Sequence, residues 1–288
     1  MSQKYVTVSI RFLFLVLLTM SLSCKKNGTD TGKDQDNQIP AIPGWDLVWN
    51  DEFKSTSINT TKWTFEVNAQ GGGNNELQYY TDRPVNAYIE NEALVITALK
   101  ETFTGVEGTR DFTSARLVTK NKGDWKYGRL DIRAKLPYGQ GLWPAIWMMP
   151  AESVYGVWAA SGEIDIVELL GQEPNKVYGT LHYGGQWPNN AHSGGFYVLP
   201  QSDFSKDFHL FTLEWDTTEF RWYVDGNHYL TQNNWYTTNF PFPAPFNQKF
   251  FLILNVAVGG NWPGSPDLST PFPQMLTVDY VRVYKKHE

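Results

Sequence analysis

The sequence predicts an all-β protein, an antiparallel β-sandwich of the jelly-roll type. Short stretches of alternating apolar and polar residues recur along the chain, as in strands with one buried face. Turn-forming residues separate these stretches, with 24 Gly and 16 Pro among 288 residues. No window of useful length shows the 3.6-residue apolar period of a helix. Hydrophobic residues make up 41% of the chain and charged residues 19%, which is enough apolar material for one large core.

Four stretches give the clearest strands. In residues 128–136, apolar residues alternate with charged ones, so one face of this strand should be buried. Residues 220–224 alternate in the same way, and the Asp-Gly dipeptide that follows is typical of a hairpin turn. Residues 250–258 are apolar except for one asparagine, which predicts a buried strand, and residues 278–284 predict the final strand.

The N-terminal residues predict export rather than a folded element. Residues 1–23 contain a short apolar run that is too short to span a membrane as a helix and is typical of a secretory signal. The run ends at Cys24, the only cysteine, where the sequence resembles a bacterial lipobox; an ordinary signal peptide with an incidental cysteine is the alternative. Residues 24–40 predict a flexible tether, and residues 41–286 the folded domain. We therefore expect an exported lipoprotein, anchored at the outer membrane or cell surface.

Composition and motifs exclude several classes of protein. The net charge of −6 argues against nucleic-acid binding, which needs a basic face. The sequence contains no G-x-S-x-G elbow, no Walker loop and no H-E-x-x-H zinc pair. The single cysteine excludes a disulfide framework. The unusual feature is the aromatic content, with 12 Trp, 15 Tyr and 17 Phe, which is more than a core requires. Because flat aromatic faces stack on sugar rings, this content favours a carbohydrate ligand.

Three acidic residues carry the predicted chemistry. Residues 162–168 read Gly-Glu-Ile-Asp-Ile-Val-Glu. In a strand, Glu163 and Asp165 lie on one face, and the isoleucines beside them point into the core. Glu168 would share the buried face, where a lone carboxylate is costly. We therefore predict a one-residue β-bulge between Asp165 and Glu168, which puts all three carboxylates on one face.

The simpler interpretation of this cluster is a solvated acidic strand face, because such a spacing arises readily by chance in a chain with 30 acidic residues. The apolar opposite face and the tryptophans that precede the cluster argue against it. Three like charges on one face repel, which raises the pKa of at least one of them. A protonated carboxyl beside an ionised one is what cleavage of a glycosidic bond requires.

Together with this cluster, several further stretches resemble glycoside hydrolase family 16, and within it the laminarinase-type bacterial endo-β-1,3-glucanases. The resemblance implies a concanavalin A-like jelly roll with a concave substrate cleft. It covers most of the chain after the tether, through residues 73–81, 113–116, 141–148, 162–168, 180–185, 255–264 and 279–284.

The resemblance implies a role for each acid. Glu163 is expected to be the nucleophile and Glu168 the general acid/base, while Asp165 is expected to hydrogen-bond Glu163 and tune its charge. The reaction would proceed with retention through a covalent glycosyl-enzyme, which needs carboxyl groups about 5–5.5 Å apart. No cofactor is expected for catalysis.

The resemblance also implies a set of substrate-binding residues: Asn75, Arg116, Trp143, Trp147, Trp158, His182, Asn255 and Trp262. Each has a structural alternative. A tryptophan of this set can be core packing, a lone histidine is more often structural, and the asparagine in an apolar strand needs a hydrogen-bond partner that is either protein or sugar.

The resemblance implies at most one structural calcium ion, away from the cleft, with Glu52 and Asp279 as carboxylate ligands. The alternative is a pair of ion-free surface carboxylates. We expect a monomer whose partner is a polysaccharide, with membrane attachment only through the lipid anchor.

Two other functions stay open at this point. One is a family 16 enzyme for mixed-linkage glucan or for a galactan such as agar, carrageenan or porphyran. Mixed-linkage relatives place the second glutamate one residue closer, whereas this chain has the additional Val167; galactan-cleaving relatives share the longer motif. The other is a non-catalytic carbohydrate-binding module, which would need the aromatic faces but not the acidic row.

Overall fold

The computed structural model describes residues 1–2 and 39–287. Cys24 and nearly all of the predicted leader and tether lie outside the described residues, so these predictions are not addressed by the structure. Ala41–Glu288 form one compact unit. None of the described residues forms a helix with the length and hydrophobicity of a membrane span.

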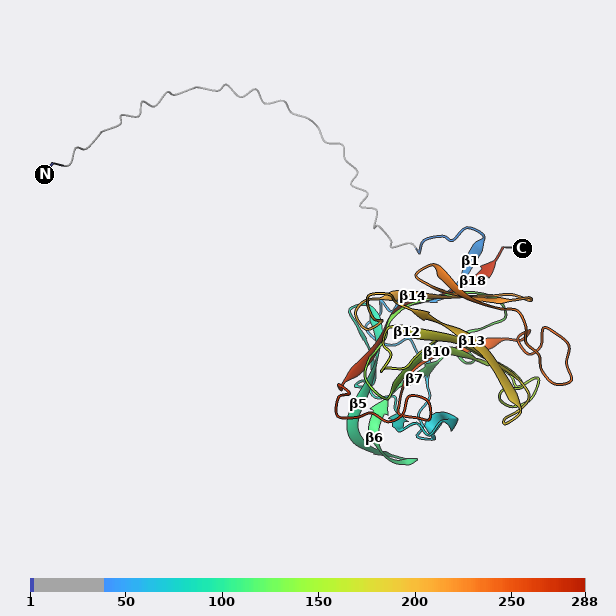
Figure 1. Cartoon of the computed structure of the whole chain (residues 1–288), viewed down its shortest axis with the longest axis horizontal. Coiled ribbons are helices and arrows are strands. Elements are labelled where there is room, and N and C mark those ends of the chain that lie inside the picture. The colour runs from blue at the N-terminus through green and yellow to red at the C-terminus, as the bar shows by residue number, and fades with distance from the viewer. Residues whose placement is uncertain (3–38, 288) are drawn as a thin grey trace, which may run out of the picture. The chain divides into compact units, whose positions relative to one another are not determined.

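Two large β-sheets make up this unit (Figure 1). The first has ten strands in the order β16-β15-β14-β9-β18-β5-β6-β3, with β1 paired to β18 and β4 to β5. Its strands are β1 (Trp45–Asp51), β3 (Gln78–Tyr80), β4 (Ala87–Glu90), β5 (Ala93–Gly105), β6 (Gly108–Ser114), β9 (Gly128–Lys135), β14 (His209–Trp215), β15 (Phe220–Val224), β16 (Asn227–Gln232) and β18 (Gln274–Lys286).

The second sheet has eight strands in the order β13-β12-β11-β10-β17-β7-β2, with β8 paired to β17. A single short 3-10 helix, η1 (Gly71–Gly73), is the only helical element among the described residues. The strands of this sheet are β2 (Thr64–Phe65), β7 (Arg116–Val118), β8 (Asp124–Trp125), β10 (Leu142–Pro150), β11 (Glu163–Leu169), β12 (Lys176–Gly184), β13 (Asn190–Val198) and β17 (Phe250–Val258).

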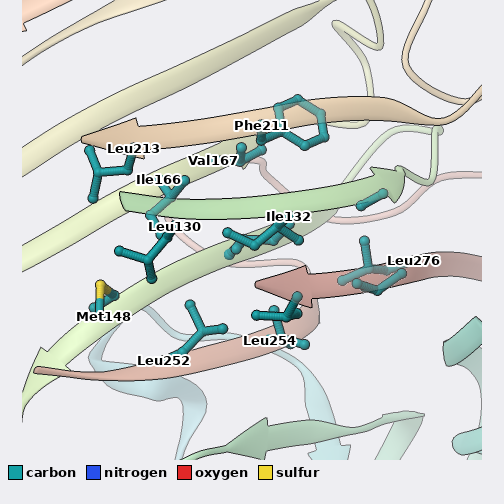
Figure 2. Close-up of a cluster of buried hydrophobic side chains, with 14 of the residues drawn as sticks. Leu130, Ile132, Met148, Ile166, Val167, Phe211, Leu213, Leu252, Leu254 and Leu276 are labelled. Carbon is teal, nitrogen blue, oxygen red and sulfur yellow. The ribbon is translucent and has the colours of Figure 1, made fainter. Parts of the chain in front are cut away.

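The core lies between the two sheets. Figure 2 shows buried side chains from both sheets meeting there, among them Leu130 of β9, Met148 of β10 and Ile166 of β11. Side chains alternate in direction along each strand, so every second residue of the eight-stranded sheet points away from this core. These outward residues of β10, β11, β12 and β17 form the floor of the cleft described below.

The predicted strands and the predicted fold class are confirmed. Residues 128–136 contain β9, whose core residues alternate as expected, and residues 250–258 form β17, which is buried along its whole length as predicted. Asp225 and Gly226 form the hairpin turn between β15 and β16, with positive φ angles of 51° and 78°. Two successive positive φ angles suit the twist of a two-residue hairpin. The final strand, β18, is longer than predicted because it pairs with β1, β5 and β9.

Candidate active site

A cleft of about 1270 Å³ lies on the outward face of the eight-stranded sheet. A cleft of this kind, lined by aromatic rings and a few convergent polar groups, is typical of a ligand-binding site. Every predicted catalytic residue lines it, and so does every predicted substrate-binding residue except Asn75.

The predicted β-bulge is present in β11. The register of β11 shifts by one residue between Asp165 and Glu168 relative to both neighbouring strands, β10 and β12. Ile166 and Val167, within the shift, are both buried in the core. The bulge therefore restores the parity of the strand, so that Glu168 points into the cleft with Glu163 and Asp165.

Each glutamic acid is held by a tryptophan. The indole N–H of Trp158 donates to Oε2 of Glu163 over 2.6 Å, and the indole N–H of Trp143 donates to Oε1 of Glu168 over 3.1 Å. An N–H donor stabilises the ionised form of a carboxylate and fixes its orientation. Trp143 and Trp158 therefore position the two carboxyl groups as well as lining the cleft.

Asp165 contacts a histidine of the neighbouring strand β12. Its Oδ2 atom lies 3.3 Å from Nε2 of His182, which also lies 3.8 Å from Oε1 of Glu163. The expected hydrogen bond between Asp165 and Glu163 stays a prediction, and in this structure the imidazole of His182, opposite Glu163 in β12, lies near both carboxylates.

Burial and mutual repulsion raise the pKa of both glutamic acids. Burial, followed by the charge of Asp165, raises the pKa of Glu163 to about 7, while His182, the Trp158 N–H and Arg116 act in the opposite direction. Burial and the charges of Asp165 and Glu163 raise the pKa of Glu168 well above its usual range. Because the nearest cations act mainly on Glu163, Glu168 holds its proton more tightly and Glu163 ionises first.

His182 supplies the main cationic field of the site. Burial lowers its pKa, but the contact with Asp165 and the charges of the two glutamates outweigh burial and raise the pKa to about 9. The imidazole is therefore protonated near neutral pH. Its position beside Glu163 favours the ionised form of that carboxyl over the ionised form of Glu168.

Two predicted sugar-binding residues have side chains that are largely engaged within the protein. Asn255 accepts a hydrogen bond from Trp147 Nε1 over 2.7 Å and donates one to the Tyr80 hydroxyl over 3.0 Å. Its amide fixes the cleft floor rather than presenting free groups to a sugar. Arg116 forms an ion pair with Glu66 over 2.8 Å and lies over the ring of Trp147.

Asn75 lies beside the cleft rather than in its lining. Its side chain donates to Asn261 over 2.9 Å, and its neighbours Asn74 and Glu76 line the cleft instead. This bond ties the segment after η1 to the loop that carries Trp262, which packs edge-on against Trp143. The prediction for Trp262 as a cleft aromatic is consistent with that position.

Apart from His182, sequence reasoning missed the residues that β12 and β13 contribute to the cleft. Tyr178 and Thr180 line it together with His182, and Phe196 of β13 lies beside Tyr178. The alternation Tyr178, Thr180, His182 within one strand was the available signal, because side chains two apart share a face.

The predicted calcium ligands form ion pairs. Glu52 accepts two hydrogen bonds from Arg282, over 3.0 and 2.8 Å, and Asp279 accepts one from Arg133 over 2.6 Å. Asp279 lies on β18, and Glu52 directly follows β1, the strand paired with it. The oxygen donors suit calcium, but the ion would have to displace these guanidinium groups.

Two glutamic acids with raised pKa values, Glu163 partly buried and Glu168 buried, lie on one face of a sheet inside an aromatic cleft and define a glycoside hydrolase site. Comparison with known proteins agrees. The chain belongs to glycosyl hydrolases family 16, whose family model matches residues 58–282.

Individual relatives are similar over most of the chain. Glucan endo-1,3-beta-glucosidase A1 of Niallia circulans is 44% identical over 265 residues, which are 86% of this chain and 39% of that protein, so this chain spans less than half of that relative. Beta-glucanase of Rhodothermus marinus is 41% identical over 93% of both chains. The catalytic domain of an endo-1,3-beta-glucanase (laminarinase) from Thermotoga petrophila RKU-1 superposes with a TM-score of 0.76 at 44% identity, covering 85% of this chain and 99% of that one.

Replacing His182 by Asn tests its electrostatic role. Loss of the imidazolium removes the main charge that favours ionised Glu163, so the pKa of Glu163 should rise. We expect the acidic limb of the kcat/KM profile to move to higher pH by about one unit. His228→Asn, an exposed histidine of β16, is the control and should leave the limb in place. An unshifted limb in His182→Asn would contradict the assignment.

Proposed function

We propose that this protein is an endo-acting hydrolase of β-1,3-glucan that works with retention of anomeric configuration. The observation that carries the proposal is the bulge-aligned pair of glutamic acids with unequal electrostatic surroundings. The cleft is open and lined by aromatic rings, which suits attack within a chain. The relatives named above as endo-1,3-beta-glucosidase and laminarinase support the choice of linkage.

In the first step, ionised Glu163 attacks the anomeric carbon, and Glu168 donates its proton to the departing glycosidic oxygen. The bond from the anomeric carbon to that oxygen breaks as the bond to Glu163 forms. In the second step, Glu168, now ionised, takes a proton from water, and the water oxygen displaces Glu163. The Trp143 N–H stabilises the ionised form that Glu168 adopts between the two steps. Asp165 and His182 lie beside Glu163 and have opposite effects on its ionisation, which Asp165 disfavours and His182 favours.

The alternatives differ from this proposal in ways that can be measured. A mixed-linkage enzyme would prefer β-1,3-1,4-glucan, and a galactan-cleaving relative would release sugar from agar, carrageenan or porphyran but not from laminarin. A non-catalytic binding module would bind glucan without turnover. The paired, raised pKa values of Glu163 and Glu168 favour an enzyme over a module, since binding alone has no use for them.

Substitution of the three acids tests the mechanism. We expect Glu163→Ala to lower kcat on laminarin by about 10⁴-fold or more while leaving binding intact, because the aromatic cleft remains. Asp165→Asn should lower kcat by about tenfold to a hundredfold, since it forms no covalent bond. Glu90→Gln, an exposed acid of β4, is the control. Full activity of Glu163→Ala would refute the assigned nucleophile.

Two further readouts separate the roles and the stereochemistry. On a substrate with a good leaving group, azide should partly rescue Glu168→Ala, because it attacks the glycosyl-enzyme without a general base. Early proton NMR of laminarin products should show the β anomer. An initial α anomer would contradict retention, and activity on agar or carrageenan but not laminarin would overturn the substrate while leaving the acid roles in place.

We also propose one structural calcium ion at Glu52 and Asp279, away from the cleft. The paired strands β1 and β18 bring the two residues to one region, and their carboxylate oxygens are suitable ligands. Calcium should raise the melting temperature with little effect on kcat. At a hundredfold excess over Kd, the free energy of unfolding should rise by about 2.7 kcal/mol. Asp279→Asn should abolish the stabilisation. Identical melting curves in calcium and in chelator would defeat the proposal.

We propose, further, that Cys24 is lipidated and that the protein is exported as a membrane-anchored monomer. The support is the apolar run that ends at the only cysteine. Several acyl chains anchor stably, whereas a single chain binds only marginally. Cys24→Ala should release the enzyme from the membrane fraction or leave the precursor unprocessed. A mutant that fractionates and matures as the parent does would show that the lipobox interpretation is wrong.

A further inference from the structure

Three segments beside the cleft contain no charged residue. Residues 153–162, 184–195 and 233–248 are 10, 12 and 16 residues long and hold no Asp, Glu, Lys or Arg. At the chain's average of 19% charged residues, about seven would be expected in segments of this total length. Charged residues are normally concentrated on protein surfaces, so adjoining surface segments without them indicate a specialised surface.

Hydrogen bonds join the three segments to one another. The buried hydroxyl of Thr237 lies 2.7 Å from the carbonyl oxygen of Ala160 and 2.9 Å from that of Gly184, so this residue of the third segment contacts both others. The backbone N–H of Trp187 donates to the carbonyl of Trp158 over 3.2 Å. The surface is therefore preorganised, which reduces the entropy lost when a ligand binds.

The outer side of these segments presents large apolar and aromatic side chains among uncharged polar ones. Figure 1 draws the third segment as the orange loop that projects at the right of the folded unit. Its Phe240 ring packs against Tyr155 of the first segment at 4.8 Å between centroids. Six residues, each 46–73% exposed, make up what we call the loop platform: Val154, Val157, Trp187, Tyr236, Phe240 and Phe242.

The loop platform is continuous with the cleft. Trp187 belongs to the platform and also lines the cleft. Trp158, whose N–H donates to Glu163, lines the cleft but is not part of the platform. The platform therefore begins where the cleft ends on the side of Glu163. A polymer that leaves the cleft on this side meets exposed aromatic rings rather than charged side chains.

We propose that the loop platform is a second polysaccharide-binding surface, which holds neutral β-glucan outside the cleft. The inference rests on the proposed function for the chemical class of the ligand. Four of the six platform residues are aromatic, which suits stacking on sugar rings. A membrane surface is the less suitable occupant, because interfacial attachment normally adds Lys or Arg to the apolar residues, and these segments contain neither.

Adsorption to insoluble β-1,3-glucan particles tests the platform in the full chain carrying Glu163→Gln, which removes turnover. Two double variants are compared, Phe240→Ser with Phe242→Ser, and Val154→Ser with Val157→Ser. Val106→Ser, a fully exposed residue at the tip of the β5–β6 hairpin, is the matched control. We expect each double variant to bind the particles about tenfold more weakly, which corresponds to about 1.4 kcal/mol, and the control to bind as the parent does.

The same substitutions are then placed in the chain with Glu163 intact. Turnover of a short soluble β-1,3-gluco-oligosaccharide should stay within about twofold of the parent, because such a substrate fills only the cleft. Melting temperatures show whether each variant is folded, and the valine pair keeps the test valid if the phenylalanine pair unfolds.

Several outcomes overturn the inference. If the folded double variants adsorb as the parent does, the platform does not bind glucan. If they lose adsorption and oligosaccharide turnover equally, the loops shape the cleft itself and form no second surface. Parent binding to phosphatidylcholine vesicles that both variants lose would assign the platform to a membrane. A parent enzyme inactive on the oligosaccharide would instead refute the proposed function, and selective loss of particle adsorption would still support the platform.

Discussion

The placement of three carboxylates on the outer face of one buried strand is the constraint on which the site depends. Glu163 and Asp165 satisfy the two-residue period of β11, and Glu168 does not. Without the bulge, Glu168 would face the core, where isolated ionisation is prohibitively costly. The extra residue is accommodated because Ile166 and Val167 are both buried in the core beneath the strand. Core packing and catalytic geometry are thus set by the same local irregularity.

This arrangement lowers stability at high pH. The folded-state pKa values of Glu163 and Glu168 are raised, so the native state binds more protons than the unfolded chain. The resulting contribution to stability is complete below the unfolded pKa of about 4.3 and is lost as pH rises through the folded values. Partial compensation comes from the indole N–H groups and from protonated His182. The large apolar core between the sheets offsets the rest of this loss of stability.

The sequence was sufficient for the fold and for the bulge, because both follow from side-chain periodicity within single strands. Side-chain partners were harder to predict. Asn255 bonds Tyr80, and Glu52 bonds Arg282, across separations of 175 and 230 residues that no local pattern encodes. The contact of Asp165 with His182 was hidden for the same reason, because it is set by the register of β12 against β11. Periodicity within β12 did hold a usable signal, in the alternating residues that end at His182.

The lack of charge in the three segments beside Glu163 links catalysis to ligand recognition. Charges interact more strongly where few ions and little water screen them, so uncharged aromatic walls preserve the coupling among Glu163, Asp165 and His182. A lysine near Trp158 would stabilise the ionised forms of all three acids and reduce the difference between the two glutamates. A neutral polysaccharide needs no charged partner, so the wall that binds it can remain uncharged. The residues that suit the ligand therefore leave intact the difference in protonation that Asp165, His182 and Arg116 impose on the two glutamic acids.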